Sequence, residues 1–563
     1  MYIRVTKSPT SKFSKVYLVE GYRDENGKVK QRIIKSYGNL EELQKEDPNI
    51  LEKLKEEAKK IPSNIVDIPV DLKDTNLSME KDKNYGYFFL EKIYYELEIP
   101  KFIMSFQTNS KEEYDLNEIL KLLVYGRILN PMSKKATFEQ QETYFEPFKV
   151  TLPSIYASLS QFHKIKQDIQ YHLHQKVNAL YNRDVSLVFY DVTNYYFETD
   201  HEDDLKKKGI SKENKKSPII QMGLLIDRNG LPIAYQLFPG NTHDSRTLEP
   251  FIEKLRKGFN LGRIILTADK GLNSKENLAY LSMKKDGYIV SQKIRGASKE
   301  FITKVLDEEG YVYNKSKTFK VKSFIRKRKV ERENKSEITL EEKVVCFWSK
   351  NFDVYEKKKR EKLEERIIEF METPSKYNAS NRYGIKKYLK LQHIDKKTGE
   401  IEKIKPILEF DREKYERDVA LDGYYVLVTS ELELSEIDII EKYRGLWKIE
   451  ESFKVLKSDL EGRPVYVRRN DYIEGHFLVC FLALLFIRII ELKLNHKYST
   501  RRIQEALKEA KCRKLNKGIY SLNKQDEVYR EIEKVFNVNL NYRYVRLEQI
   551  RLYRRDIIHN NKN

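Results

Sequence analysis

Cysteine is scarce in this sequence: only Cys346, Cys480 and Cys512 occur among 563 residues, and no two of them form a CxxC pair. Isolated thiols exclude a disulfide framework and argue against a structural zinc site, and they are typical of a reducing cytoplasm. The first residues, MYIRVTKSPT, include no apolar segment of the signal-peptide kind. The most apolar run, 477–487, stops at Arg488 and is too short to span a bilayer, which favours a buried helix. We therefore expect a cytoplasmic protein that does not enter a membrane.

Internal repeats and low-complexity tracts are also lacking, apart from a bias towards lysine. What the sequence has in excess is basic charge: 106 Lys and Arg against 86 Asp and Glu give a formal net charge of +20. Such an excess favours a polyanionic partner, most commonly nucleic acid, although an AT-rich genome also enriches lysine. The chain is long enough for roughly two to four domains.

The apolar pattern changes its period along the chain. Strand-like runs with a D-E-N-G turn at Asp24–Gly27 come first, and a helical period follows from 87 to 182. Three strand-like runs, a helix, and then alternating strand and helix come next, with a D-R-N-G hairpin turn at Asp227–Gly230. This order predicts an α/β fold with an RNase H-like mixed sheet and helices.

The same pattern predicts seven segments. The helical segment, with paired lysines in the turn NPMSKKA at 130–136, fits a reader of DNA ends or a plain packing domain equally well. Beyond residue 294 we expect short strands interrupted by charge-rich segments such as YEKKKREKLEER. The segments are 1–60 (small β-meander plus helix), 61–85 (linker), 86–182 (helical), 183–294 (first part of the RNase H-like domain), 295–420 (mostly β insertion), 421–500 (second part of that domain) and 501–563 (basic C-terminal helical region).

Two aspartates stand where apolar strands give way to loops. Asp191 ends the run SLVFYD, and Asp269 ends the run RIILTAD. The end of a strand is a usual ligand position in α/β sheets, and a carboxylate desolvated there on one side favours a nearby cation. An aspartate at the end of a strand is, taken alone, more often a turn-former or a helix cap than a functional residue.

A third carboxylate lies in the stretch Glu441–Leu460, which we expect to be one continuous amphipathic helix. At about 100° per residue, an apolar stripe should pack on a core. An adjacent stripe carries Tyr443, Trp447, Glu450, Lys454 and Lys457, whereas Glu451 points to water. Glu450 is therefore the expected site carboxylate, and the aromatic and lysine residues are expected to bind DNA. An ordinary surface helix would show the same two faces.

Together, Asp191, Asp269 and Glu450 would form an all-oxygen site. Such a site suits Mg²⁺ or Mn²⁺ rather than zinc, and two ions about 3.5–4 Å apart support phosphoryl transfer.

Four segments of the chain resemble DDE transposases of bacterial insertion sequences, in the branch with a β-rich insertion before the glutamate. They are FYDVTNYYFET, QMGLLIDRNGLPIAYQLFPGNTHDSRTL, ILTADKGLNSKENLAYL and YRGLWKIEESFKVLKSDLEGRPVYVRRNDYIEGHF, and the resemblance covers about 85–500. It implies a metal-binding triad of Asp191, Asp269 and Glu450, with Tyr443 and Lys457 on phosphates of the transposon end. The family's arginine falls on Leu446, which our helical reading buries.

The resemblance also implies what the protein does. A DDE transposase cleaves at the terminal inverted repeats of its element with Mg²⁺ and joins the freed 3′-OH to target DNA, as a homodimer when the two ends are paired. We expect it to act in the bacterial cytoplasm at the nucleoid. Two alternatives stay open: an RNase H-like nuclease without strand transfer, and a non-catalytic DNA-binding repressor from a decayed element.

Three further features have a functional and a structural interpretation. His243 could approach a phosphate or metal, or cap its loop. Trp348 in the insertion could stack on an extruded base, or pack in a core. The basic run Lys315–Arg332 could track a DNA backbone, or be a solvated face.

Overall fold

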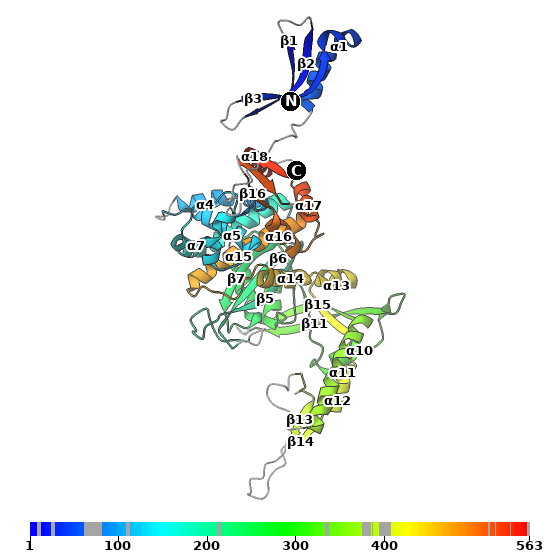
Figure 1. Ribbon diagram of the computed structural model, residues 1–563. Helices are drawn as coiled ribbons and strands as arrows, with labels where there is room; N and C mark the ends of the chain where they lie inside the picture. The colour runs from blue at the N-terminus through cyan, green and yellow to red at the C-terminus, as the bar shows by residue number, and fades with distance from the viewer. Residues whose placement is uncertain are drawn as a thin grey trace.

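The computed structural model describes most of the chain, and Figure 1 shows the order of its elements. The described residues are 1–7, 13–23, 29–60, 81–108, 113–210, 216–332, 337–373, 384–385, 387–392, 407–515, 518–523, 525–540 and 542–559. The turn expected at Asp24–Gly27 and most of the linker expected at 61–85 lie outside these residues.

The N-terminal unit is a three-stranded antiparallel sheet covered by two helices. It comprises β1 (Tyr2–Lys7), β2 (Ser14–Arg23), β3 (Val29–Asn39), α1 (Leu40–Glu46) and α2 (Ile50–Lys60), with strand order β1-β2-β3. Val16, Leu18 and Val19 of the middle strand are buried, as are Leu54 and Ala58 of α2. In Figure 1 this unit stands apart from the rest of the chain.

The centre of the protein is a nine-stranded mixed sheet of order β10-β11-β12-β15-β9-β8-β5-β6-β7. Its middle strands follow the RNase H-like scheme. β5, β6 and β7 are antiparallel neighbours, β8 pairs in parallel with β5, and β9 pairs in parallel with β8. The bounds are β5 (Leu187–Tyr196), β6 (Ile219–Asp227), β7 (Pro232–Pro239), β8 (Ile265–Ala268) and β9 (Gly287–Ser291). The α/β, RNase H-like fold expected from the sequence is confirmed.

Alternating side chains bury both faces of this sheet, so helices cover it on each side. Val188 and Tyr190 of β5 pack with α8 (Leu248–Arg256) and α9 (Lys275–Met283). Leu187 and Phe189 join the larger core on the other face, where α7 (Leu152–Tyr181) and α15 (Asn470–Lys493) pack together. Helix α15 is long and apolar enough to cross a membrane, but 94% of its most apolar window is buried in the protein, as expected for a core helix.

A helical layer and a small sheet complete the larger core. The layer contains α3 (Phe88–Glu96), α4 (Ile99–Gln107), α5 (Leu116–Leu129), α6 (Lys134–Glu139) and the 3₁₀ turn η2 (Gln141–Thr143). The C-terminal part contains α16 (Thr500–Glu509), β16 (Lys511–Lys514), β17 (Ile519–Leu522), α17 (Glu527–Val535), β18 (Tyr544–Arg546) and α18 (Leu547–His559).

The small sheet corrects two of our expectations. Its order is β18-β17-β16-β4, and β4 (Lys83–Asn84) comes from the segment expected to be a linker. The C-terminal region is therefore not purely helical. Strands of two to four residues are too short to show a period of two, and β4 pairs with a strand more than 400 residues away in sequence.

The insertion begins as an extension of the central sheet. The hairpin of β11 (Phe319–Glu331) and β12 (Glu337–Ser349) pairs through β12 with β15 (Tyr424–Thr429), which pairs with β9. Before it come α10 (Lys299–Leu306) and β10 (Val312–Tyr313).

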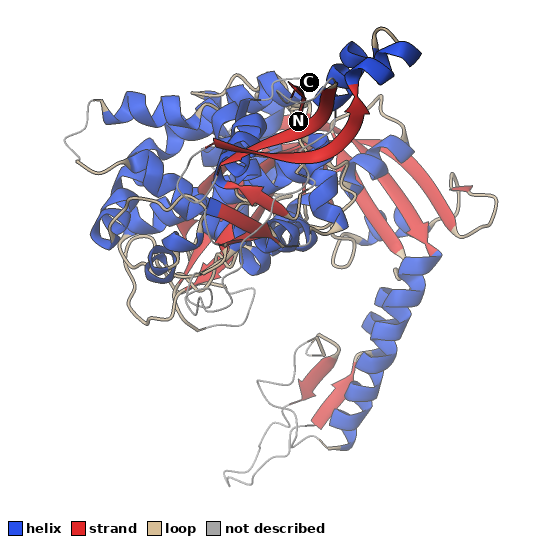
Figure 2. Cartoon of the chain, turned by 45° about the horizontal axis from the view of Figure 1, so that its top comes forward, coloured by secondary structure: helices blue, strands red, loops and turns tan. Residues whose placement is uncertain are grey.

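A long helix, α11 (Lys350–Glu372), then projects from the body, and the hairpin of β13 (Leu389–Gln392) and β14 (Ile407–Phe410) lies at its far end with α12 (Arg412–Val419) (Figures 1 and 2). The charge-rich segment that we expected to interrupt short strands is this helix. Only Ile367 and Phe370 of α11 are buried, so its sequence shows almost no apolar stripe.

Candidate functional site

Asp269 directly follows β8, whereas Asp191 lies within β5, the parallel neighbour of β8, and not at a strand end as expected, because β5 continues to Tyr196. The register of β5 and β8 pairs Leu187 with Ile265 and Phe189 with Thr267. Two residues further along each chain, Asp191 and Asp269 occupy matching positions, and both side chains are half-buried. Because alternate residues share a face, the two carboxylates lie on the same face of the sheet as Phe189 and Thr267.

Two helices cross that face. α13 (Glu436–Arg444) contacts β8 and β9, and α14 (Trp447–Lys454) contacts β5 and β6. Gly445, between the helices, lies directly on the sheet, since a Cβ at this position would be 2.5 Å from Cζ of Phe189. The absence of a side chain therefore lets the helices approach the strand that carries Asp191.

The stretch expected to be one continuous helix is broken twice. α13 ends at Arg444 and α14 begins at Trp447, after a turn at Gly445 and Leu446. α14 then passes into a π-helical turn, η5 (Val455–Asp459). A wheel at 100° per residue assumes an unbroken helix, so it misplaces residues beyond each break. π-turns inside helices are frequent at functional sites.

Asp269 is held by hydroxyl groups. Ser291, which ends β9, donates from Oγ to Oδ1 of Asp269 at 3.0 Å, and the hydroxyl of Tyr443 on α13 lies 3.5 Å from the same oxygen. Tyr443 also contacts the hydroxyl of Tyr425 on β15 at 3.0 Å. Burial, followed by the neighbouring Tyr425, raises the pKa of Tyr443, so its hydroxyl stays neutral. Sequence reasoning missed Ser291 and Tyr425, although both lie on strands that it recognised.

Glu450 is exposed on α14, and its neighbours fix the flank on which it lies. Lys448 donates from Nζ to the carbonyl of Arg228 at 2.7 Å, in the turn between β6 and β7. Glu450, two residues on, is about 200° further around the helix. We infer that it lies on the opposite flank of α14, towards β8 and Asp269.

The neighbouring carboxylate, Glu451, has a structural partner rather than pointing to water. It lies 3.6 Å from Nη1 of the buried Arg488 on α15, whose closest carboxylate is Glu491 at 2.5 Å. The carboxylate of Glu450 has neither a hydrogen bond nor an ion pair among the described residues.

The described residues contain no group of three or more His, Cys, Asp or Glu side chains arranged to hold a metal ion. The strand register puts Asp191 and Asp269 at neighbouring positions, and α14, which carries Glu450, packs on β5 and β6, but these residues form no closed set of ligands. The donors are nevertheless of the right kind. Neither Asp269 nor Glu450 forms an ion pair with Lys or Arg in the described part of the chain. A half-buried carboxylate such as Asp269, held only by neutral hydroxyls, fits a cation that the protein does not itself supply.

The other residues expected on this helix differ in exposure. Trp447 is 56% exposed and Lys454 is exposed, so both side chains are open to solvent. Lys457, in the π-turn, lies with its ammonium 5.5 Å from the centre of the Tyr195 ring on β5. Leu446 is buried, as the helical reading required.

His243 and Trp348 have structural roles. His243 is exposed and caps the 3₁₀ turn η3 (Asp244–Arg246), with Nδ1 accepting from the backbone NH of Ser245 at 3.3 Å. Trp348 is half-buried against Gly423, where a Cβ would be 2.4 Å from Nε1 of the indole.

The basic run Lys315–Arg332 is largely neutralised within the protein, which argues against a DNA track. Arg326 and Arg328 both bind the buried Glu342. Arg332 binds Glu249 and Glu276, and Lys320 binds Glu308. The remaining pairs are Lys327 with Glu341 and Lys329 with Glu337.

Comparison with known proteins adds two family matches. Residues 186–486 match the family described as "Transposase DDE domain", and residues 3–65 match "IS1634 family transposase, N-terminal domain". No curated protein matches the chain.

Among solved structures, the chain is similar to a piggyBac transposase synaptic complex with hairpin DNA, at 9% identity and a TM-score of 0.36 over 85% of each chain. It is also similar to a pre-cleavage Mos1 transpososome, at 12% identity and a TM-score of 0.14 over 32% of this chain and 60% of that one. At such low similarity, these structures do not assign a role to any residue of the present chain.

Proposed function

The chain belongs to the family of transposases with a DDE domain, the family expected from its motifs, and we propose that it cleaves DNA at the ends of an insertion sequence and transfers the freed 3′-OH to target DNA. The observation that supports this proposal is the parallel register of β5 and β8, which pairs Phe189 with Thr267 and, when extended by two residues, brings Asp191 level with Asp269. Both sit under helices that also carry Glu450.

We propose that Asp191, Asp269 and Glu450 hold two divalent cations, Mg²⁺ or Mn²⁺. When bound, such ions polarise the phosphodiester and offset the charge that develops during phosphoryl transfer. Asp191, on the strand that α14 contacts, would be the shared ligand. The hydroxyls of Ser291 and Tyr443 fix one oxygen of Asp269 and leave the other free to face a cation.

The remaining residues of the site position DNA. Trp447 and Lys454 are open to solvent, and Lys457 lies near the end of β5, so a phosphate backbone could run along α14 and its π-turn. In the first step, water attacks the phosphodiester at the element's end and the 3′-OH leaves. In the second, that 3′-OH attacks a target phosphodiester, so one such bond forms as another breaks. No protein nucleophile is required, because positioning and charge stabilisation supply most of the rate.

The partners that we propose are the terminal inverted repeats and target DNA, with a homodimer formed when two ends are paired. The protein would act in the bacterial cytoplasm at the nucleoid.

Cleavage of labelled end DNA tests the proposal, with Glu450→Gln compared with Glu451→Gln. We expect Glu450→Gln to lower cleavage by at least about 100-fold while end binding persists, because affinity comes mainly from basic contacts with phosphates. Glu451→Gln should keep cleavage, since Arg488 retains Glu491. EDTA should abolish cleavage by the unchanged protein. Equal losses in both variants would contradict the assignment of Glu450.

Two assays separate the alternatives. Pre-cleaved ends with a free 3′-OH should give joined product, and a nuclease without strand transfer would give none. A repressor from a decayed element would bind ends with no Mg²⁺-dependent cleavage by the unchanged protein.

A further inference from the structure

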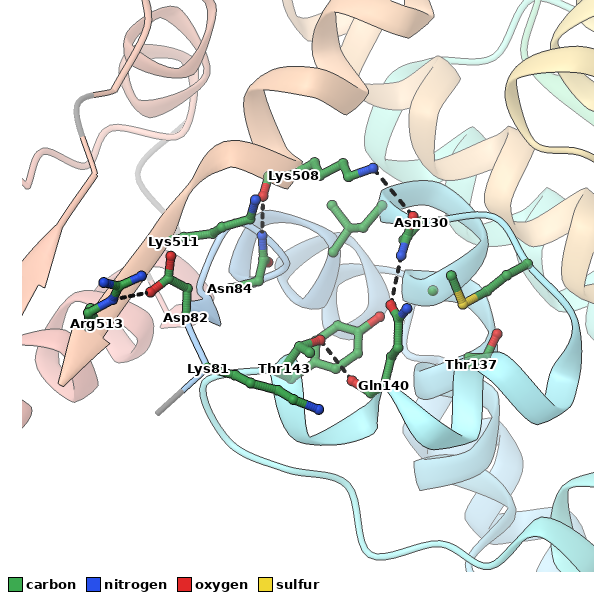
Figure 3. A pocket seen from close by; sticks show the side chains of 14 residues that line it. Lys81, Asp82, Asn84, Asn130, Thr137, Gln140, Thr143, Lys508, Lys511 and Arg513 are labelled. Atoms are coloured by element: carbon green, nitrogen blue, oxygen red, sulfur yellow. Dashed lines mark hydrogen bonds and ion pairs between the residues drawn. The ribbon is translucent and has the colours of Figure 1, made fainter. Parts of the chain in front are cut away.

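A cavity of about 500 Å³ lies outside the carboxylate site, where three distant parts of the chain meet (Figure 3). Its walls come from residues 81–84 at β4, from the end of α5 through η2, and from α16 and β16. The volume lies within the range of small-molecule and cofactor sites.

The rim of this cavity is basic. Lys81, Lys508, Lys511 and Arg513 line it, and among the described residues Asp82 is the one acidic side chain in the lining. Asp82 is bound by Arg513 at 2.6 Å, and Lys511 pairs with Glu509 at 3.0 Å. Lys508 donates only to the neutral Asn130 amide, at 3.3 Å, and Lys81 has no partner among the described residues. Two ammonium groups are therefore available to an anion such as a phosphate.

The interior of the cavity offers unused hydrogen-bonding groups. Tyr144 is 5% exposed, and its hydroxyl has no partner in the described part of the chain. Gln140 accepts from Asn130 through Oε1 at 2.7 Å, which leaves its NH₂ group without a partner in the same part. The Tyr144 hydroxyl lines the cavity, so a ligand that enters could form a hydrogen bond with it.

The cavity also has apolar walls, and the absence of a side chain at Gly126 leaves its interior open. Leu129 and Met132 line it beside Tyr144. A Cβ on Gly126 would be 2.9 Å from Cγ2 of Thr137 and 3.5 Å from the Tyr144 hydroxyl, so a side chain there would occupy the interior. The cavity thus combines a cationic rim, apolar side chains and polar groups.

We propose that this cavity binds one unpaired nucleotide of the DNA, with its phosphate at Lys508 and Lys81 and its base against Leu129, Met132 and Tyr144. The inference rests on the proposed function, which supplies DNA as the substrate. A phosphate alone would use the rim but not the apolar walls, whereas a nucleotide uses both. The NH₂ group of Gln140 and the hydroxyl of Tyr144 would face the edge of the base.

The walls of the cavity also hold the segment that follows the catalytic helix. Arg127 of α5 donates to the carbonyls of Leu460 and Glu461 at 3.3 and 3.2 Å. Gln504 of α16 donates to the carbonyl of Asp459, at the end of the π-turn, at 3.1 Å. A nucleotide in the cavity is therefore fixed to the same structural unit as Glu450.

The test is the binding of two DNA duplexes without a divalent metal, measured by fluorescence anisotropy. One duplex is fully paired, and the other carries a single unpaired nucleotide. We expect the unchanged protein to prefer the second by about tenfold, as for base stacking on an aromatic site. Tyr144→Phe, which removes only the hydroxyl, and Lys508→Ala should each reduce that preference, leaving affinity for the paired duplex within about twofold. Lys135→Ala, on the exposed face of α6, should change neither.

Equal binding of the two duplexes by the unchanged protein would overturn the proposal, as would a preference that both variants retain. Titration with free dGMP separates the two sources of a nucleotide: binding of dGMP with no preference for the unpaired duplex would assign the cavity to a free nucleotide instead of DNA. Asp191→Ala should lose cleavage and keep the preference, so failure of the catalytic proposal and failure of this one give different results.

Discussion

A buried ion pair near helix α14 offers a quantitative test of the fold. Nε of Arg183 lies 3.3 Å from Oδ2 of Asp227, and the two side chains are 1% and 0% exposed. Neither atom has a hydrogen-bond partner in the described part of the chain, so the contact is an ion pair without a well-aimed hydrogen bond. The second oxygen of Asp227 accepts from the backbone NH groups of Asn229 and Leu231, each at 2.9 Å, and forms the turn on which Lys448 rests.

Asp227→Asn removes the charge and keeps an oxygen for the turn. It leaves the Arg183 guanidinium buried without a counter-charge, which costs about 3–5 kcal/mol. Burial already lowers the pKa of Arg183 to about 10, which shows how poorly this environment tolerates the cation. At about 2–4 °C per kcal/mol for a domain of this size, the melting temperature should fall by roughly 10 °C.

The double variant Arg183→Met with Asp227→Asn removes both charges. It loses the hydrogen bond from Arg183 to the carbonyl of Pro232, at 2.8 Å, which is worth about 1 kcal/mol. Since buried pairs of imperfect geometry contribute little net stability, the double variant should melt within about 4 °C of the unchanged protein. Differential scanning fluorimetry at pH 7 measures the melting temperatures of the unchanged protein, the two single variants and the double variant, which together form a double-mutant cycle.

The single variant Arg183→Met should depend on pH. Burial raises the pKa of Asp227 above its ordinary value, and loss of the cation raises it further. The folded state then binds the proton more tightly than the unfolded state, so stability is highest at low pH and falls as the pH rises above about 4. If Asp227→Asn lowers the melting temperature by less than about 2 °C, the buried charge pair does not stabilise this turn.

Three further outcomes follow from other contacts. Gly445→Ala should place its Cβ against Phe189 and cost about 1–3 kcal/mol, with reduced cleavage; unchanged melting and cleavage would mean that the helices do not rest on β5. Burial lowers the pKa of Lys134 to about 7. Between about pH 7 and about pH 10 the lysine is therefore protonated in the unfolded state but not in the folded state, so the free energy of unfolding rises with pH over this range. Lys134→Met should flatten that rise in the melting temperature, and an unaltered slope would contradict the assignment. His243→Ala should remove the cap on Ser245 at a cost of about 1 kcal/mol without loss of cleavage; a large loss of cleavage would give His243 a role in the chemistry instead.

The sequence determined the strands and their order, because apolar runs of four or more residues record burial directly. It therefore predicted the RNase H-like sheet and the position of Asp269 directly after β8, but not that of Asp191, which lies within β5 because that strand continues to Tyr196. The sequence did not predict elements whose local pattern of apolar residues does not indicate burial. Helix α11 has almost no apolar stripe, and β4 finds its partner only in the folded chain.

Tertiary structure alone decided how the third carboxylate is presented. The turn at Gly445 and the π-turn η5 change the phase of the helix that carries Glu450, and Arg488 engages Glu451 from a helix distant in sequence. It also decided the environment of the basic run Lys315–Arg332, where arginines form ion pairs with carboxylates on other elements. Periodicity reports which residues are buried, but only the packed chain sets the partner of each charge, because those partners come from segments that sequence spacing does not connect.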